Sequence, residues 1–91
     1  MIRVFALYPE EPEPARYAEH VALAERETPE ATIRHGRIIG SPAGEPRYRY
    51  YFEYEFADRE AWKRSQDALM KAAEDAQAIG NPFEVFFAEL G

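Results

Sequence analysis

The feature that most constrains the fold is a strict alternation of side chains between residues 47 and 56. Aromatic side chains occupy one parity, and the other is mostly charged: Tyr48, Tyr50, Phe52, Tyr54 and Phe56 against Arg47, Arg49, Tyr51, Glu53 and Glu55. Successive side chains of a β-strand point to opposite faces of a sheet, so a period of two predicts a strand. The chain therefore needs a partner layer that buries the aromatic face.

Three further strands and two helices are expected around this strand. Apolar runs at 2–8 and 83–90 have the length and composition of buried strands, and 31–39 is extended before the turn residues of 40–46. A helix begins near Pro14 and ends at Thr28-Pro29, because the residue before proline avoids the α region. Its inward stripe has helical spacing: Tyr17, His20, Val21 and Ala24.

The second helix is expected after Asp58, which acts as its N-cap, and it stops at Gly80-Asn81-Pro82 with a candidate interruption at 65–67. The resulting order, β-α-β-β-α-β, predicts an α+β ferredoxin-like fold with a four-stranded antiparallel sheet and both helices on one face. A chain of 91 residues has the size of one compact domain, so residues 1–91 are expected to form a single domain.

Two of the strands carry apolar side chains at both odd and even positions, so both faces of the sheet are expected to be hydrophobic and to need covering. Val4 and Phe5 show this in the first strand, and Phe86 and Phe87 show it in the last. Two helices on one face leave the other uncovered. We therefore predict a homodimer in which the uncovered faces of two copies pack together as an α/β barrel.

Composition excludes several classes of partner and location. The net charge of −6 and the scattered basic residues disfavour nucleic acid, and no apolar run approaches the roughly 20 residues that cross a bilayer. The chain has no cysteine, which excludes disulfides and thiolate metal cages. The opening MIRVFALYP is too short for a signal peptide, so a cytoplasmic location is the simplest expectation.

Several segments, in order, resemble the EthD-like group of the dimeric α/β-barrel superfamily. They are MIRVFALYP, YAEHVALAER, GRIIGSPAGEP, FEYEFADREAW and AAEDAQAIGN, and together they span nearly the whole chain. The resemblance implies a pocket between the sheet and the helices of each subunit. Across that superfamily the pocket serves cofactor-free oxygenation, isomerisation or cyclisation of small aromatic or lactone compounds, and some remote relatives hold haem there.

His20 is the candidate catalytic residue, because it lies on the inward stripe of the first helix. An imidazole there could act as general acid or base on an acidic C–H or phenolic O–H. The alternative is a core histidine that bonds a backbone carbonyl or a tyrosine hydroxyl.

Candidate substrate-binding residues are the aromatic side chains that could surround a flat ring, and for each the alternative is plain core packing. Tyr17 would orient the ligand, Tyr50 and Phe52 lie mid-strand, and Trp62 would close the pocket. His35 either meets His20 across the pocket or faces the dimer seam.

No metal or cofactor is expected. Glu19 points about 100° away from its neighbour His20 around a helix, so the pair is not an iron site. Glu53 and Glu55 share a strand face with Arg47 and Arg49, which favours ion pairs that fix the barrel seam over an acid–base pair.

Two functions remain open. One is a small cofactor-independent enzyme, and the other is a non-catalytic dimeric protein that binds a small molecule or assists an oxidative pathway. The enzyme needs His20 and a tyrosine hydroxyl to converge on a cavity of roughly 300 Å³ or more. Haem binding is a third, remote alternative.

Overall fold

In a computed structural model that describes residues 1–91, four strands and three helices follow one another along the chain. The elements are β1 (Ile2–Tyr8), α1 (Pro14–Glu27), β2 (Thr32–Arg37), β3 (Tyr50–Phe56), α2 (Arg59–Arg64), α3 (Gln66–Ile79) and β4 (Glu84–Glu89). The strands form one sheet in the order β2-β3-β1-β4, and every neighbouring pair is antiparallel. The predicted ferredoxin-like α+β fold is confirmed.

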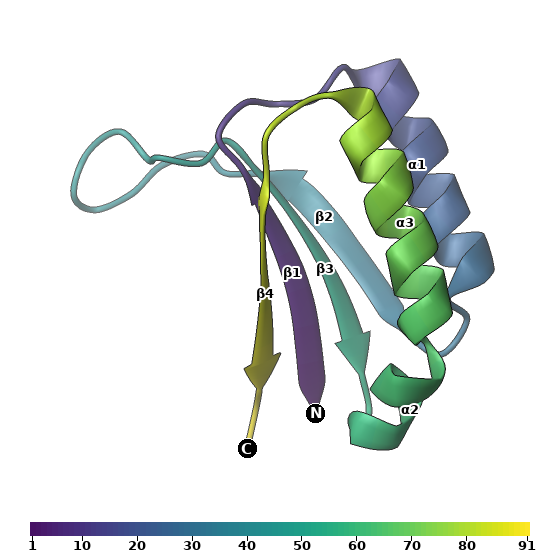
Figure 1. The fold of residues 1–91 in the computed structure, drawn as a ribbon. Coiled ribbons are helices and arrows are strands. Elements are labelled where there is room, and N and C mark those ends of the chain that lie inside the picture. The colour runs from purple at the N-terminus through teal and green to yellow at the C-terminus, as the bar shows by residue number, and fades with distance from the viewer.

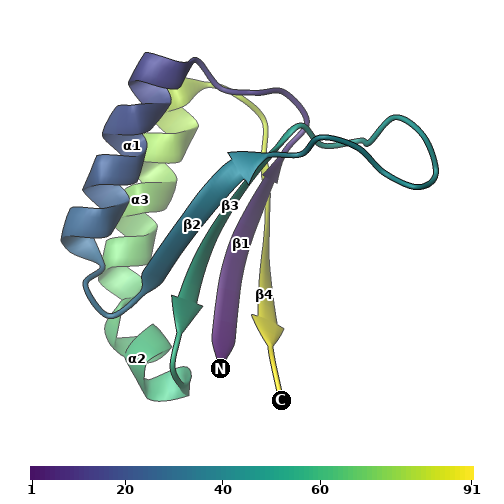
Figure 2. The ribbon, with the colours of Figure 1, turned by 180° about the vertical axis from the view of Figure 1, so that it is seen from behind.

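The molecule has two layers, a sheet and a pair of long helices, and only one face of the sheet is covered. Figure 1 shows α1 and α3 side by side against that face, and the view from behind in Figure 2 shows the same arrangement. In both views the connection between β2 and β3 extends beyond the sheet on the side away from the helices. No helix combines the length and apolar character needed to span a bilayer.

The core lies between the helices and the even-numbered residues of β1 and β3. Ile2 pairs with Phe56 and Tyr8 with Tyr50, so these two central strands direct the same parity of side chains toward the helices. The predicted inward stripe of α1 is buried as expected: Tyr17, His20, Val21 and Ala24. Alternation in β3 and helical spacing in α1 thus meet in one core.

The helix ends follow the predicted chemistry. Glu13 caps α1 by accepting hydrogen bonds from the backbone N–H groups of Ala15 and Arg16, and Asp58 caps α2 through Ala61 N–H. The predicted interruption falls at Ser65, the residue between α2 and α3. Its hydroxyl donates to the Ala61 carbonyl at 2.9 Å. α3 ends at Gly80, which has φ 94°.

Candidate functional site

His20 takes part in a three-residue cluster that joins the two long helices. His20 is 3% exposed, and its Nδ1 lies 2.9 Å from Oδ2 of Asp75 on α3. Arg16, one turn before His20 on α1, donates to both oxygens of the same carboxylate, at 2.8 Å and 3.4 Å. A carboxylate only accepts hydrogen bonds, so the Nδ1 position carries the hydrogen that Asp75 receives.

Small residues bring the helices close enough for this contact. Ala24 of α1 is completely buried, and Ala72 and Ala76 of α3 are each 4% exposed. Side chains four residues apart lie on one helix face, so Ala72 and Ala76 form a smooth stripe beside Asp75. The Asp75 carboxylate can therefore reach across to His20 without a bulky neighbour in between.

The cluster holds Asp75 in its charged form. The Arg16 guanidinium lowers the pKa of the Asp75 carboxyl below its ordinary value, partial burial opposes that effect, and the His20 hydrogen bond adds to it. Asp75 therefore keeps the hydrogen on Nδ1 of His20. The other ring nitrogen, Nε2, makes no hydrogen bond within the protein, and in the neutral imidazole with Nδ1–H it is the nitrogen that has the lone pair.

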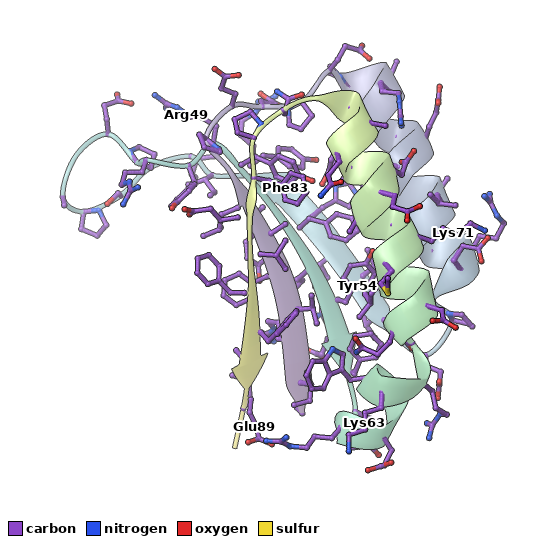
Figure 3. The ribbon with its side chains drawn as sticks, viewed as in Figure 1. Arg49, Tyr54, Lys63, Lys71, Phe83 and Glu89 are labelled. Atoms are coloured by element: carbon purple, nitrogen blue, oxygen red, sulfur yellow. The ribbon has the colours of Figure 1, made fainter.

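His20 lines a cavity between the sheet and α3, which we call the α3 cavity. Its volume is about 220 Å³, and 14 of its 16 lining residues are hydrophobic. Figure 3 shows Tyr54 directed from the sheet toward α3, and Lys71 on the outer side of the helices. The lining residues Met70 and Phe87 are 64% and 65% exposed, so the cavity opens to solvent between α3 and β4.

Tyrosine side chains line the α3 cavity beside His20. Burial raises the pKa of both Tyr8 and Tyr54, so these phenols stay protonated at neutral pH. The Tyr17 ring packs against the His20 ring with centroids 5.3 Å apart, and its buried hydroxyl makes no hydrogen bond of acceptable geometry. His20 and tyrosines therefore converge as the enzyme hypothesis requires, on a cavity smaller than the expected 300 Å³.

The other candidate residues divide between two cavities. Phe52 lines the α3 cavity with His20, whereas Tyr17, Tyr50 and His35 line a separate cavity beside α1, which we call the α1 cavity. The register places His35 opposite Phe52, on the helix-covered side of the sheet, and its Nδ1 lies 2.9 Å from the Tyr50 hydroxyl. The two histidines thus lie on different sides of the Tyr17 and Phe52 rings.

Trp62 lines neither of these two cavities. It packs against Phe87, with ring centroids 5.4 Å apart, and Phe87 lines the α3 cavity. The indole Nε1 is buried without a hydrogen-bond partner. Trp62 therefore supports one wall of the α3 cavity from behind.

Sequence reasoning missed Asp75 and the role of Tyr8. Asp75 is separated from His20 by 55 positions, and its contact depends on which faces of two helices meet. A weak signal exists, because the alanines at 72 and 76 predict close helix packing around position 75. Tyr8 is the last residue of β1, and its parity with Val4 could have placed it on the covered face.

No group of three or more His, Asp or Glu side chains is arranged to hold a metal ion. The site offers a base, a partly buried carboxylate partner and phenols as its chemical groups.

The uncovered face of the sheet divides into an aromatic and a charged half. Phe5 stacks between Phe86 and Tyr51, with centroid distances of 5.5 Å and 6.0 Å. In the charged half, Glu53 is only 7% exposed although no helix covers it. It accepts hydrogen bonds from Arg34 at 2.9 Å and from the Tyr51 hydroxyl at 2.5 Å.

The predicted ion pairs of Glu53 and Glu55 with Arg47 and Arg49 are wrong. Arg3 of β1 donates to Glu55 at 2.8 Å, and Arg34 of β2 bonds both carboxylates. The physical reason is that β3 begins at Tyr50, so Arg47 and Arg49 belong to the preceding loop. There Arg49 pairs with Glu45, and the Arg47 guanidinium lies over the Tyr48 ring.

Comparison with known proteins supports the fold. No model of a protein family matches the chain, and no curated protein sequence matches it. A solved structure of an ethyl tert-butyl ether degradation (EthD) family protein from Bacillus halodurans matches with a TM-score of 0.76 at 23% identity, covering 100% of this chain and 99% of that one. A dimeric ferredoxin-like protein of unknown function from Jannaschia matches at 0.72, with 22% identity and 98% of both chains covered.

A third similar structure has a named activity. It is SnoaB, a cofactor-independent oxygenase from Streptomyces nogalater, with a TM-score of 0.62, 17% identity, and coverage of 98% of this chain and 91% of that one. These identities establish a common architecture only. The chain thus has the EthD-like ferredoxin-like fold that its sequence predicted.

Proposed function

We propose that this protein is a small cofactor-independent enzyme that acts on a small aromatic or lactone-like compound in the α3 cavity. The observation that carries the proposal is His20, whose Nδ1 is bonded to Asp75 while Nε2 remains free beside an apolar cavity. A base of this kind works best where water is excluded and its tautomer is fixed. The shared architecture with a cofactor-independent oxygenase adds support.

The chemistry begins with removal of a proton from an acidic C–H or phenolic O–H by Nε2 of His20. The imidazolium that forms is stabilised by Asp75, which Arg16 keeps ionised. Return of the proton to another carbon would complete an isomerisation. Alternatively, the carbanion adds O₂ to give a peroxide anion, which takes the proton back from His20 to become a hydroperoxide and then loses water to leave a ketone.

The cavity limits the substrate to a compact molecule. A volume of about 220 Å³ with mostly hydrophobic walls suits one or two fused rings with few polar groups. The neutral phenols of Tyr8 and Tyr54 can donate a hydrogen bond to a carbonyl whose oxygen becomes negative as the proton leaves.

Proton abstraction can be tested without knowing the natural substrate. The protein is incubated in D₂O with 2-tetralone, a two-ring ketone with an acidic C–H bond, and deuterium incorporation is followed by proton NMR. We expect exchange above the buffer rate that is lost in His20→Ala and reduced in Asp75→Asn. Glu74→Gln is the matched control, since Glu74 is the exposed acidic neighbour of Asp75.

The alternative is a non-catalytic protein that binds a small molecule or assists an oxidative pathway. The apolar lining favours this alternative, because hydrophobic walls can bind a small molecule by burying its apolar surface, and His20 is the one imidazole among them. Binding of 2-tetralone, detected by Trp62 fluorescence, without any deuterium exchange would support this alternative and contradict the enzyme.

We further propose that two copies of the chain associate through their uncovered sheet faces. Phe5 and Phe86 lie on an exposed aromatic half, and the adjacent Arg3, Arg34, Glu53 and Glu55 set has no net charge, so it can be covered without an unpaired ion. Two of the similar solved structures are described as dimeric.

The dimer is tested by gel filtration with light scattering at micromolar concentration. We expect twice the chain mass for the wild type and for Ala22→Glu, which changes an exposed residue of α1 on the opposite side of the molecule. Phe86→Glu places a charge in the proposed contact and should give a monomer with unchanged circular dichroism. A monomeric wild type would refute the proposal.

A further inference from the structure

The α1 cavity is a second, partly open space that the proposed reaction does not use, and its lining includes the exposed residues Ala18 and His35. Its volume is about 240 Å³, close to that of the α3 cavity, and half of its eight lining residues are hydrophobic. Aromatic rings from α1, β2 and β3 meet there: Tyr17, His35 and Tyr50. The Tyr17 and Tyr50 rings pack edge to face at 5.2 Å, and Tyr17 meets His35 at 6.5 Å.

The polar groups of this cavity include one hydrogen-bonded pair, His35 and Tyr50. His35 Nδ1 is 2.9 Å from the Tyr50 hydroxyl, and Nε2 of this exposed residue makes no hydrogen bond within the protein. If the phenol donates to Nδ1, Nε2 carries a hydrogen; if it accepts, Nε2 carries a lone pair. A ligand hydroxyl satisfies either state, because it is both donor and acceptor.

The charges at the rim cancel. Glu11 is the only carboxylate in the lining, and both of its oxygens accept hydrogen bonds from Arg37, at distances between 2.8 Å and 3.2 Å. Neither a cationic nor an anionic ligand therefore meets an uncompensated charge. The remaining apolar surface comes from Pro12, Pro14, Ala18 and Val21.

Tyr17 contributes its ring to the α1 cavity. The residue is 4% exposed and lines the cavity, whereas its hydroxyl is buried beside Tyr8, which lines the α3 cavity. A ligand in the α1 cavity therefore meets the aromatic ring of Tyr17.

We propose that the α1 cavity is a second small-molecule site, for an uncharged flat compound of one or two rings that bears a hydroxyl group. The ring lies against Tyr17 and Tyr50, and the hydroxyl bonds Nε2 of His35. This site is separate from the one in the proposed function, since the Tyr17 and Phe52 rings lie between His35 and His20.

The chain offers a direct readout, because it has two histidines and each lines a different cavity. The imidazole C–H signals of His20 and His35 are assigned by comparing the wild type with His35→Gln. The intact protein is then titrated with 2-naphthol at constant pH. We expect a saturable shift of the His35 signals, and binding about tenfold weaker for naphthalene, which lacks the hydroxyl.

Two alanines on α1 provide a matched pair of variants. Ala18 lines the α1 cavity and is exposed at the helix surface, whereas Ala22, one turn later, is exposed and lines neither cavity. Ala18→Leu should weaken 2-naphthol binding at His35 at least tenfold, and Ala22→Leu should leave it unchanged.

The proposal is overturned if the His35 signals do not shift up to the solubility limit, or if both leucine variants bind alike. A shift confined to His20 would place the probe in the α3 cavity and would also overturn it, while supporting the proposed function. A shift confined to His35 supports the second site and leaves the deuterium-exchange test of the α3 cavity independent.

Discussion

Removal of the Asp75 carboxylate is the most informative perturbation of the cluster between the helices. Asp75→Ala takes away the acceptor of the His20 Nδ1–H group, in a residue that is 3% exposed. Leaving a buried donor unpaired costs about 1–3 kcal/mol, and loss of the partly exposed pair with Arg16 adds up to about 1 kcal/mol. The Asp75 side chain is 25% exposed, so little packing is lost. The free energy of unfolding should fall by roughly 1–4 kcal/mol.

Other variants separate the contributions. Asp75→Asn keeps an oxygen that can accept the hydrogen bond from His20, but it loses the negative charge. The free energy of unfolding should therefore fall by roughly 1 kcal/mol, as for loss of an exposed ion pair. Arg16→Ala should cost less than about 1 kcal/mol, because water can replace the guanidinium. Glu74→Gln also removes one negative charge, but from an exposed position, so its free energy of unfolding should stay within about 0.5 kcal/mol of the wild-type value.

The assay is urea unfolding followed by circular dichroism, with all variants at one protein concentration because association would add to the apparent stability. The expected order of destabilisation is Asp75→Ala, then Asp75→Asn, then Arg16→Ala. The reasoning is refuted if Asp75→Ala costs less than about 1 kcal/mol, or if Arg16→Ala costs as much. Either result would mean that the His20 to Asp75 hydrogen bond contributes little.

The cluster also gives a dependence on pH. The pKa of Asp75 is lower in the folded protein than in the unfolded chain, so the unfolded chain binds the proton first as the pH falls. The contribution of the charged carboxylate is therefore complete above the ordinary Asp pKa of about 3.9, and it is lost as the pH falls below that value. Asp75→Asn should lose less stability than the wild type on acidification.

Three further predictions follow from local features. Gly80→Ala should cost about 1 kcal/mol in urea unfolding, because Gly80 has φ 94° while no atom lies within 4 Å of an added Cβ. Trp62→Phe should change stability by less than about 1 kcal/mol, since it removes an indole N–H that has no partner. All six tyrosines have a raised pKa, and that of Tyr51 rises to about 12, chiefly through burial. An absorbance titration should therefore show little tyrosinate at pH 10, and stability should fall as the pH rises above that value.

The sequence predicted the elements well, because local patterns determine them. The helical spacing of Tyr17 and His20 and the alternation in β3 each report which side of one element is buried, and the structure confirms both. The interruption at Ser65 was also predicted, since polar residues there break the apolar periodicity.

The arrangement of the candidate site could not be predicted in the same way. Asp75 meets His20 only because two helices pack at a particular rotation, which depends on the alanines between them. The incorrect pairing of Glu53 with Arg47 has a similar origin, because periodicity within one strand does not reveal the neighbouring strands that supply Arg3 and Arg34. The division of the aromatic residues into two cavities depends on ring orientations that spacing does not determine.

The charge-balanced set on the uncovered face also bears on what it costs to cover that face. In the proposed dimer, Glu53 and its arginine neighbours would be shielded from water by an identical surface. Because Arg3 and Arg34 belong to the same copy as Glu53 and Glu55, each copy brings its own counter-charges into the contact. A copy without Arg34 would bury one carboxylate without compensation whatever its partner, at a cost of about 3–5 kcal/mol, or more than a hundredfold in affinity. The network would thus permit this face to be buried without deciding which surface covers it.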